Sequence, residues 1–336
     1  MKAAKIIVAL AVLAGIIIAF VGVTDQGERL VVYSGRSQSL VEPIIEQFQE
    51  ETGMRVQVKY GTTPQLAMTL REEGERSPAD VFWAQEAGAL EALDEEGFFS
   101  ELPAHVFEDS NPAVRHAGDH WAATSGRARV LAFNTDQVSA DELPGDVRDL
   151  TEPEWEGRVG WAPSNGSFQA FLTGMRLIHG EEAARDWVQG MRDNGAMAYA
   201  NNTAIVQALG AGEIDAGLTN HYYLLRFKED DPDFPVDQVF FDAGDPGNLV
   251  NYAGIGALRS ARHEEAAHQF IRFLLEEDAQ DYFTNEVYEY PVNDAVERHE
   301  ALVALDELNR LSPEVELAAM EDLEGTLNLL RDAGVL

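Results

Sequence analysis

The sequence of 336 residues contains no cysteine. This absence excludes disulfide bonds, thiolate metal sites, a cysteine nucleophile and an N-terminal cysteine that carries a lipid. Three motifs of catalytic and nucleotide-binding sites are also missing, namely the GxSxG nucleophile elbow, the phosphate-binding loop and the dinucleotide fingerprint. The sequence therefore predicts a protein that is not an enzyme, with a secreted hydrolase as a remote alternative.

Basic residues are scarce, with 24 lysines and arginines against 59 acidic residues and a formal net charge of −35. Such a charge repels nucleic acid and anionic lipid, so neither is expected as a partner. Two interpretations remain. The acidity either keeps the protein soluble in a high-salt habitat, where the Debye length falls to about 3 Å, or it attracts cations generally. Because the acids are scattered along the chain, the sequence favours the halophilic interpretation.

The N-terminus carries the longest apolar run. Lys2 and Lys5 precede an uninterrupted apolar stretch at 6–23, and polar residues follow from Thr24. The run is close to the length of about 18 residues at which a membrane span becomes plausible. Residues 1–25 are therefore predicted to be a signal peptide or an N-terminal membrane anchor, and the chain after about Asp25 is expected to be extracytoplasmic.

Strand-like and helix-like segments alternate from residue 29 onward, which is typical of α/β layering with parallel strands. Strands are predicted at 30–34, 56–60, 80–84, 121–134, 157–162 and 214–219. Helices are predicted at 39–53, from 63, at 87–96, from 167, and at 181–193, 203–211, 263–275, 277–285 and 319–332. No proline- or glycine-rich linker divides the chain, so two interleaved lobes are expected. Ligands of such sheets bind beyond the carboxyl ends of strands, here at 33–38, 84–86, 163–167 and 219–223.

Adjacent tyrosines, Tyr222 and Tyr223, follow the last of these strands and open a helix. A phenol has an ordinary pKa of about 10, but a bound trivalent cation can convert it to phenolate, a hard oxygen donor for Fe(III). The alternative is that one tyrosine packs in the core while the other covers a surface. The spacing alone leaves both interpretations open.

Small polar residues at 164–167 precede the predicted helix that starts at Ser167. A helix start of this kind binds anions through its free N–H groups and its dipole, although an ordinary N-cap needs only one such residue. Two histidine pairs, His116 with His120 and His263 with His268, lack the spacing or the glutamate of a zinc protease. They are predicted to be surface histidines.

Several segments closely resemble the ferric-iron-binding periplasmic proteins of ABC transporters. These segments are VVYSGRSQ (31–38), SPADVFWAQEAGAL (77–90), SGRARVLAFN (125–134), PEWEGRVGW (153–161), NNTAIVQAL (201–209), NHYYLLRF (220–227), DPGNLVNYAGIG (245–256) and YEYPV (288–292). The resemblance implies a two-lobed type II periplasmic-binding-protein fold, with two crossing hinge strands near 127–131 and 252–256 and a ligand cleft between the lobes. Lobe 1 would comprise 29–126 plus 257–300, and lobe 2 would comprise 127–256 plus 301–336.

In that family a tyrosine pair binds iron, which assigns Tyr222 and Tyr223 as ligands of Fe(III) as cargo. The family also holds a synergistic anion such as carbonate or phosphate, which the resemblance assigns to Asn165, Gly166, Ser167 and Asn220. The implied function is that of a monomeric binding protein that delivers iron to an ABC transporter permease. It would touch the membrane through its N-terminal segment if that segment is uncleaved.

Three positions depart from the family pattern. Ser37 stands where some members carry a histidine, Gln85 where they use a glutamate, and Phe168 where others have an additional tyrosine. Glu86, Gln85 and Ser37 are therefore candidates for additional metal or cleft contacts, and iron is expected to be held more weakly or as a chelate. The alternative function is a binding protein for an inorganic anion or a chelated iron species.

Overall fold

The computed structural model describes residues 29–315, 319–320 and 322–336. The segment 1–25, predicted to be a signal peptide or an anchor, lies outside the described residues. Within the described ranges, no helix combines the length and the apolar character that crossing a membrane requires.

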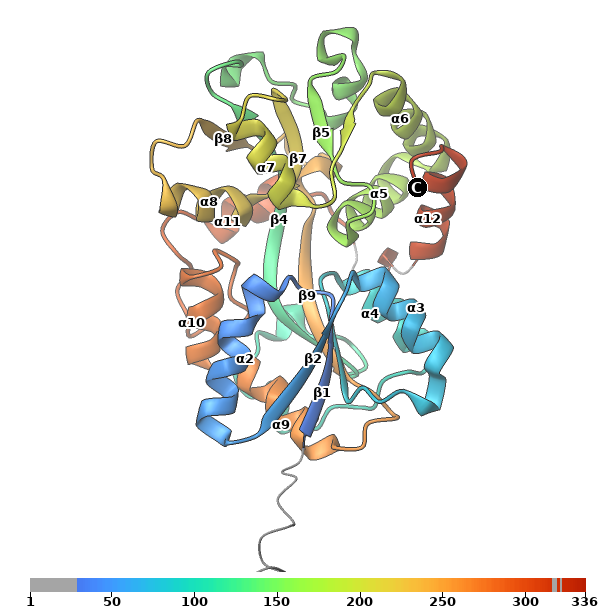
Figure 1. Cartoon of the computed structure of the whole chain (residues 1–336), viewed down its shortest axis with the longest axis vertical. Helices are drawn as coiled ribbons and strands as arrows, with labels where there is room; N and C mark the ends of the chain where they lie inside the picture. The colour runs from blue at the N-terminus through green and yellow to red at the C-terminus, as the bar shows by residue number, and fades with distance from the viewer. Residues whose placement is uncertain (1–28, 316–318, 321) are drawn as a thin grey trace, which may run out of the picture.

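Two lobes lie one above the other, and two long strands run between them (Figure 1). The lower lobe contains β1 (Arg29–Ser34), α2 (Gln38–Thr52), β2 (Arg55–Tyr60), α3 (Thr63–Glu73), β3 (Val81–Ala84), α4 (Ala87–Glu95), α9 (Glu264–Leu275) and α10 (Glu277–Asn285). The upper lobe contains β5 (Val159–Trp161), α5 (Gly166–His179), α6 (Glu181–Asp193), β6 (Met197–Ala198), α7 (Asn202–Gly210), β7 (Ala216–Asn220), α8 (His221–Asp230), β8 (Val236–Val239), α11 (Leu305–Leu311) and α12 (Leu323–Asp332). Short 3-10 helices lie at Gly74–Arg76, Ala104–Phe107, Pro112–Val114, Ala140–Glu142, Val147–Thr151, Pro153–Trp155 and Pro246–Asn248.

The connecting strands are β4 (Ala122–Asn134) and β9 (Val250–Ala257). In the lower lobe β1 lies between parallel β2 and β3, and β9 is antiparallel to both β3 and the first half of β4. The second half of β4 pairs with β7 and β8, while β5 lies between parallel β7 and β6. Because β4 and β9 run from one lobe into the other, the prediction of two crossing strands is confirmed.

Local sequence explains where the first helices begin and end. Helix α2 ends at Gly53, whose φ of 70° is the left-handed conformation that glycine adopts without a steric penalty. Helix α3 begins with a capping box between Thr62 and Gln65, and Pro64 lies in its first turn. All thirteen residues of β4 are buried, as expected for a strand that is covered on both faces.

The long predicted elements are confirmed within one or two residues, whereas three short ones were not predicted. Strand β6 has only two residues, and β8 has the half-polar sequence VDQV, so neither carries a clear period. Helix α11 has seven residues and was also missed. The last helix begins at Leu323 rather than at 319, with the Asp322 side chain accepting the Gly325 N–H at its start.

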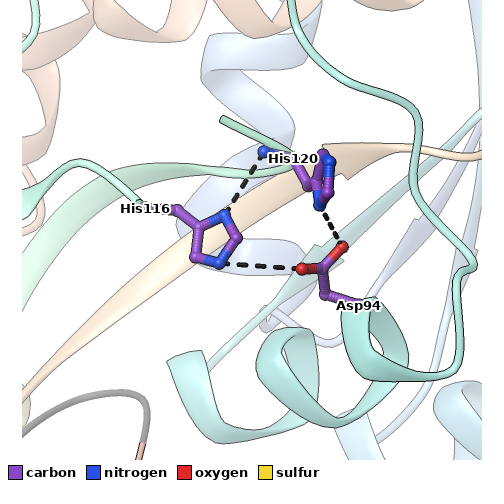
Figure 2. A group of neighbouring side chains, drawn as sticks. All are labelled: Asp94, His116 and His120. Carbon is purple, nitrogen blue, oxygen red and sulfur yellow. Dashed lines mark hydrogen bonds and ion pairs between the residues drawn. The ribbon is translucent and has the colours of Figure 1, made fainter. Parts of the chain in front are cut away.

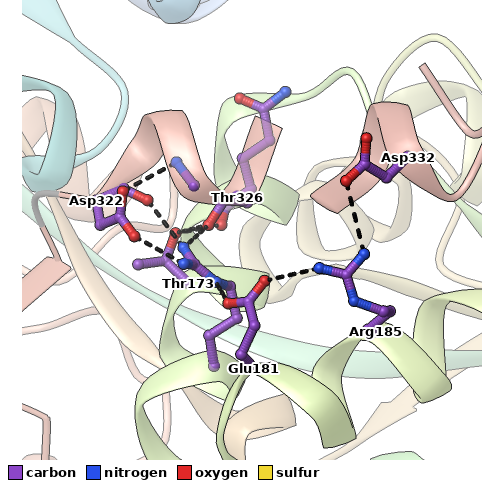
Figure 3. A network of polar contacts seen from close by, with 9 residues as sticks. Thr173, Glu181, Arg185, Asp322, Thr326 and Asp332 are labelled. Atoms are coloured by element: carbon purple, nitrogen blue, oxygen red, sulfur yellow. Dashed lines mark hydrogen bonds and ion pairs between the residues drawn. The ribbon is translucent and has the colours of Figure 1, made fainter. Parts of the chain in front are cut away.

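A polar network holds the C-terminal helix α12 against α5 and the start of α6 (Figure 3). Arg176 of α5 donates to the Asp322 carboxylate at 2.7 Å, to the Thr326 hydroxyl at 2.9 Å and to Glu181 at 2.5 Å. Its side chain is only 14% exposed. Arg185 makes longer contacts with Glu181 and with Asp332 at the end of α12.

Replacing Arg176 with methionine is expected to lower the free energy of unfolding by about 1.5–3 kcal/mol, because charge-assisted hydrogen bonds between α5 and α12 are lost. Urea denaturation measures this change, and hydrogen exchange should show faster exchange in α12. The matched control is Arg185→Met, whose exposed ion pairs are expected to contribute about 0–1 kcal/mol. Equal effects of the two substitutions would contradict this account of α12.

Candidate metal and anion site

Loops from both lobes meet around a cavity of about 200 Å³. The lower lobe contributes the segments that follow β1, β2 and β3, and the upper lobe contributes the starts of α5 and α7. Four of the predicted site residues line this cavity, namely Ser37, Gln85, Asn165 and Gly166. The carboxyl ends of parallel strands and the N-termini of helices thus face the same space, as predicted for 33–38, 84–86 and 163–167. The fourth predicted segment, 219–223, does not line this cavity.

Tyr222 and Tyr223 lie in the first turn of α8, directly after β7. Their rings stack with centroids 4.3 Å apart, and their exposed fractions are 0% and 5%. The Tyr222 hydroxyl is buried without a hydrogen-bond partner. Burial raises the pKa of Tyr222 well above 10, and Tyr223 adds to the shift.

Both tyrosines are therefore buried, which by itself agrees with core packing. Buried hydroxyls nearly always have a partner, however, so the unpaired Tyr222 oxygen calls for an explanation. Coordination of this oxygen to a bound metal ion provides such an explanation. Two adjacent phenols suit a hard cation.

Three buried arginines lie near the tyrosines. Arg36 follows β1, while Arg127 and Arg129 lie two residues apart on β4, and none is more than 3% exposed. All three nitrogens of the Arg127 guanidinium lack a hydrogen-bond partner. Burial lowers the pKa of Arg129 to about 9, which leaves it charged at neutral pH. This concentration of buried positive charge favours anionic groups, including phenolates, in the cleft.

One of these arginines has a carboxylate partner. Arg36 donates to both carboxylate oxygens of Glu289 at 2.8 Å, and the Ser125 hydroxyl donates to the same carboxylate. Glu289 is completely buried. Of the three buried arginines, only Arg36 is thus bonded to a carboxylate of the described residues.

The predicted anion-binding residues form a hydrogen-bonded group at the start of α5. Asn165 caps the helix by accepting the Ser167 N–H at 3.0 Å, and the Ser167 hydroxyl donates to Asn165 at 2.7 Å. Arg129 donates to the Ser167 hydroxyl and to the Asn220 side-chain oxygen, both at 3.4 Å. Asn202 also donates to Ser167, at 3.2 Å. The structure thus brings Asn165, Gly166, Ser167 and Asn220 close to one another.

The three positions that depart from the family pattern have different surroundings. Ser37 is exposed at the start of α2, and Gln85 is buried with its N–H donating to the Thr63 hydroxyl at 3.0 Å. Phe168 packs edge-on against Trp161, with ring centroids 5.6 Å apart, inside the upper core. Its ring therefore belongs to the aromatic core of the lobe and supplies no donor atom to the cleft.

Glu86 lies deeper in the cleft than Ser37. It is 2% exposed, and neither carboxylate oxygen has a hydrogen-bond partner. Burial raises its pKa to about 7, while the charges of Arg127 and Arg36 act in the opposite direction. The carboxylate packs against Gly166 of the other lobe, where an added Cβ would lie 2.5 Å from Oε2.

Four residues of the site were not predicted from the sequence, namely Arg36, Arg127, Arg129 and Glu289. A signal for two of them was available, because arginines at i and i+2 of a strand point to the same face and are unusual in a fully buried strand. No local pattern marks the partnership of Arg36 with Glu289, since these residues are brought together by the fold.

The prediction of surface histidines holds for His120 and His263, which are 30% and 29% exposed, and is wrong for His116 and His268. The His116 and His120 side chains are 12% and 30% exposed and converge on Asp94 of α4 (Figure 2). His268 is buried, and His263 lies 3.1 Å from the buried Asp80 carboxylate. The packing of α4 and of the start of α9 decides this burial, and the spacing within each pair contains no information about it.

Comparison with known proteins agrees with this architecture. The sequence profile of the bacterial extracellular solute-binding proteins matches residues 76–312. The chain is 30% identical over 315 residues to the Fe(3+)-binding periplasmic protein of Serratia marcescens, covering 93% of this chain and 91% of that protein. It is 32% identical to the major ferric iron-binding protein of Neisseria meningitidis, covering 91% and 93%.

The crystal structure of iron-bound HitA from Pseudomonas aeruginosa matches with a TM-score of 0.86 and 32% identity, covering 91% of this chain and 99% of that one. A Trichodesmium protein in complex with iron and citrate matches with a TM-score of 0.72 and 27% identity, covering 92% and 100%. These relatives bind solutes and are not enzymes, in agreement with the sequence prediction. The chain therefore belongs to the family of bacterial extracellular solute-binding proteins that includes the periplasmic ferric-iron-binding proteins.

Proposed function

We propose that this protein is the extracytoplasmic binding component of an ABC importer, that it binds ferric iron between its lobes and that it delivers the iron to a membrane permease. It acts as a monomer. The proposed lobes are 29–126 plus 257–300 and 127–256 plus 301–336, with β4 and β9 as the hinge.

One observation carries the proposal, namely the buried stacked pair of Tyr222 and Tyr223 with an unpaired hydroxyl. Two phenolates would supply hard anionic oxygens to Fe(III). The relatives named for ferric-iron binding support the same cargo.

The surrounding groups give the cleft its chemistry. Arg36, Arg127 and Arg129 stabilise phenolates by placing positive charge around a buried site. An oxyanion at the start of α5 completes the ligand set, held by Asn165, Gly166, Ser167 and Asn220, with carbonate and phosphate as external candidates. Glu86, Gln85 and Ser37 are the residues from which further oxygen ligands would come.

Binding couples to closure because the two halves of the site belong to different lobes. A ligand that contacts both the tyrosines and the lower-lobe loops stabilises the closed arrangement relative to the open one. The permease would then recognise the closed form. No step of this cycle transforms the cargo chemically.

A second candidate is the binding of an inorganic anion or of a chelated iron species. The three buried arginines favour it, since two of them lack a bonded carboxylate among the described residues. An organic chelator would also supply the donor atoms that other family members provide through a histidine at the position of Ser37 and a tyrosine at the position of Phe168.

Adding ferric citrate to the purified protein tests the function. We expect a visible charge-transfer band from phenolate-bound iron and, by metal analysis after gel filtration, one iron per chain. A colourless protein that retains phosphate but no iron would establish the second candidate instead. Recovery of citrate together with the iron would identify a chelate as the cargo.

A further inference from the structure

Glu86 occupies an unusual position at the junction of β3 and α4. It is the residue before the first turn of α4, in an extended conformation with φ −142° and ψ 148°, yet its side chain caps nothing in that helix. The carboxylate is buried, and both oxygens lack a hydrogen-bond partner. Burying a carboxylate without partners is costly, so the group needs a compensating environment.

The carboxylate meets the start of α5 across the cleft. A Cβ placed on Gly166 would lie 2.5 Å from Oε2, 2.8 Å from Oε1 and 2.8 Å from Cδ of Glu86. Helix α5 has fourteen residues, and the N–H groups of its first turn have no acceptor within the helix. Its dipole places partial positive charge at the point where this carboxylate packs.

Two cationic side chains lie near Glu86. Arg127 and Arg36 both act on its ionisation, and the Arg127 guanidinium has no hydrogen-bonded partner of its own. A single carboxylate therefore lies between a helix N-terminus of one lobe and buried arginines of the cleft. This is the environment expected for a bound oxyanion.

We propose that Glu86 is the anion of the iron site, and that its carboxylate fills the position at the start of α5 that carbonate or phosphate would otherwise take. The inference rests on the proposed function, since it concerns the same cleft. It differs from the proposed function in that the site needs no external anion. Because Glu86 belongs to the lower lobe and Gly166 to the upper lobe, the same contact also helps to close the cleft.

The substitution Glu86→Gln distinguishes a site in which Glu86 is the anion from a site that needs an external anion. Glutamine has nearly the same shape but no charge, and its amide can donate a hydrogen bond to an external anion. The variant should therefore remove the negative charge from the anion position without leaving a large cavity. Glu101→Gln is the matched control, because Glu101 is an exposed carboxylate of the same lobe.

Iron affinity is measured by competition with a chelator, following the visible band in carbonate-free buffer and again with phosphate added. The wild-type protein should bind equally well in both buffers. Glu86→Gln should lose about 10- to 100-fold in affinity without phosphate, the cost of losing a charged hydrogen-bond partner, and recover most of it when phosphate is added. Glu101→Gln should behave as wild type.

Two results would overturn the assignment of Glu86. One is a wild-type protein that forms its coloured complex only when phosphate or carbonate is supplied. The other is a Glu86→Gln variant with wild-type affinity in both buffers. Failure of the wild-type protein to bind iron under any anion condition would instead reject the proposed function, so the two failures are distinguishable.

A second cluster lies outside the cleft, where α4 meets the loop before β4. Asp94 and Glu91 of α4 face His116 and His120. Figure 2 shows Asp94, His116 and His120, whose donor atoms all lie within 4.8 Å of one another. His116 Nε2 is 3.6 Å from a carboxylate oxygen of Asp94 and 3.6 Å from one of Glu91. His120 Nδ1 is 2.7 Å from the other Asp94 oxygen.

These separations are close to what a tetrahedral zinc site requires. With metal–ligand bonds of about 2.0–2.1 Å, neighbouring donors lie about 3.3 Å apart. Gly118 allows the rings to approach, since an added Cβ would lie 3.0 Å from the His116 ring and 3.3 Å from His120 Nδ1. Trp121 stacks on His116 at 5.4 Å and holds that ring in place.

The geometry points to a site for a zinc-like divalent cation formed by Asp94, His116, His120 and Glu91. Each imidazole would bind through the nitrogen that now faces a carboxylate, and its proton would move to the other ring nitrogen. For His116 this weakens the 3.3 Å contact between its Nδ1 and the His120 N–H, which is the cost of binding.

Calorimetric titration with Zn²⁺ tests this site, using protein that carries Tyr222→Phe and Tyr223→Phe so that the cleft tyrosines do not contribute. We expect one bound zinc per chain, and at least about a 100-fold lower affinity after His116→Gln with His120→Gln. His105→Gln, at an exposed histidine, is the control. Equal zinc binding with and without His116 and His120, or no binding at all, would overturn the site.

Discussion

Replacing Tyr222 and Tyr223 together with phenylalanine is expected to abolish the visible band of the iron-loaded protein and to lower its iron affinity more than about 1000-fold. Losing a residue that merely supports a metal ligand already costs about 10- to 100-fold, and this change removes two direct ligands. Both phenolate oxygens disappear while the ring stack remains. Absorption spectroscopy and chelator competition measure the two effects.

The same substitution should leave the fold intact. The Tyr222 hydroxyl is buried without a hydrogen-bond partner, so removing it leaves no other polar group unpaired. Tyr33→Phe is the matched control, because that hydroxyl bonds to Glu73 at 3.0 Å and lies outside the described site. If the double variant still gave the coloured complex, the tyrosine pair would not be the iron ligand.

Breaking the buried pair of Arg36 and Glu289 is expected to have the largest effect on stability. The substitution Glu289→Gln should lower the free energy of unfolding by about 3–5 kcal/mol, because it leaves the Arg36 charge buried without its counter-ion. The Ser125 hydroxyl also loses its carboxylate acceptor. Urea denaturation at constant pH and salt measures the change.

The matched comparison removes both charges at once. A buried ion pair replaced by apolar residues of similar volume is often neutral for stability, so Arg36→Met with Glu289→Leu should be more stable than Glu289→Gln alone. A Glu289→Gln protein within 1 kcal/mol of wild type would show that Arg36 has another source of compensation. Iron binding by the apolar pair would then report how far Arg36 supports the phenolates.

Local sequence patterns predicted the strands and helices that have a clear hydrophobic period or clear boundary residues. Hydrophobic period and boundary residues identified three such elements, namely the strand at 30–34, the helix that ends at Gly53 and the buried strand β4. Strand β6 could not be predicted, because two residues have no period. Its existence depends on the neighbouring strand β5, to which it pairs.

Some residues of the candidate site could likewise be predicted from short segments, and others could not. Adjacent tyrosines after a strand and small polar residues before a helix are features of short segments, so Tyr222, Tyr223 and the start of α5 could be named in advance. The partnership of Arg36 with Glu289, by contrast, joins residues from opposite ends of the chain. No local pattern encodes such a pair.

The sequence by itself thus determined the α/β layering, the two lobes and the tyrosine pair, because each follows from side chains within one element or from a chain-long resemblance. Only the tertiary structure decided which charges share the cleft. It placed Glu86 of one lobe against Gly166 of the other, and it brought Arg36, Arg127 and Arg129 near the tyrosines. The physical reason is that burial and electrostatic pairing depend on distances in space, which two crossing strands set between segments far apart in the chain.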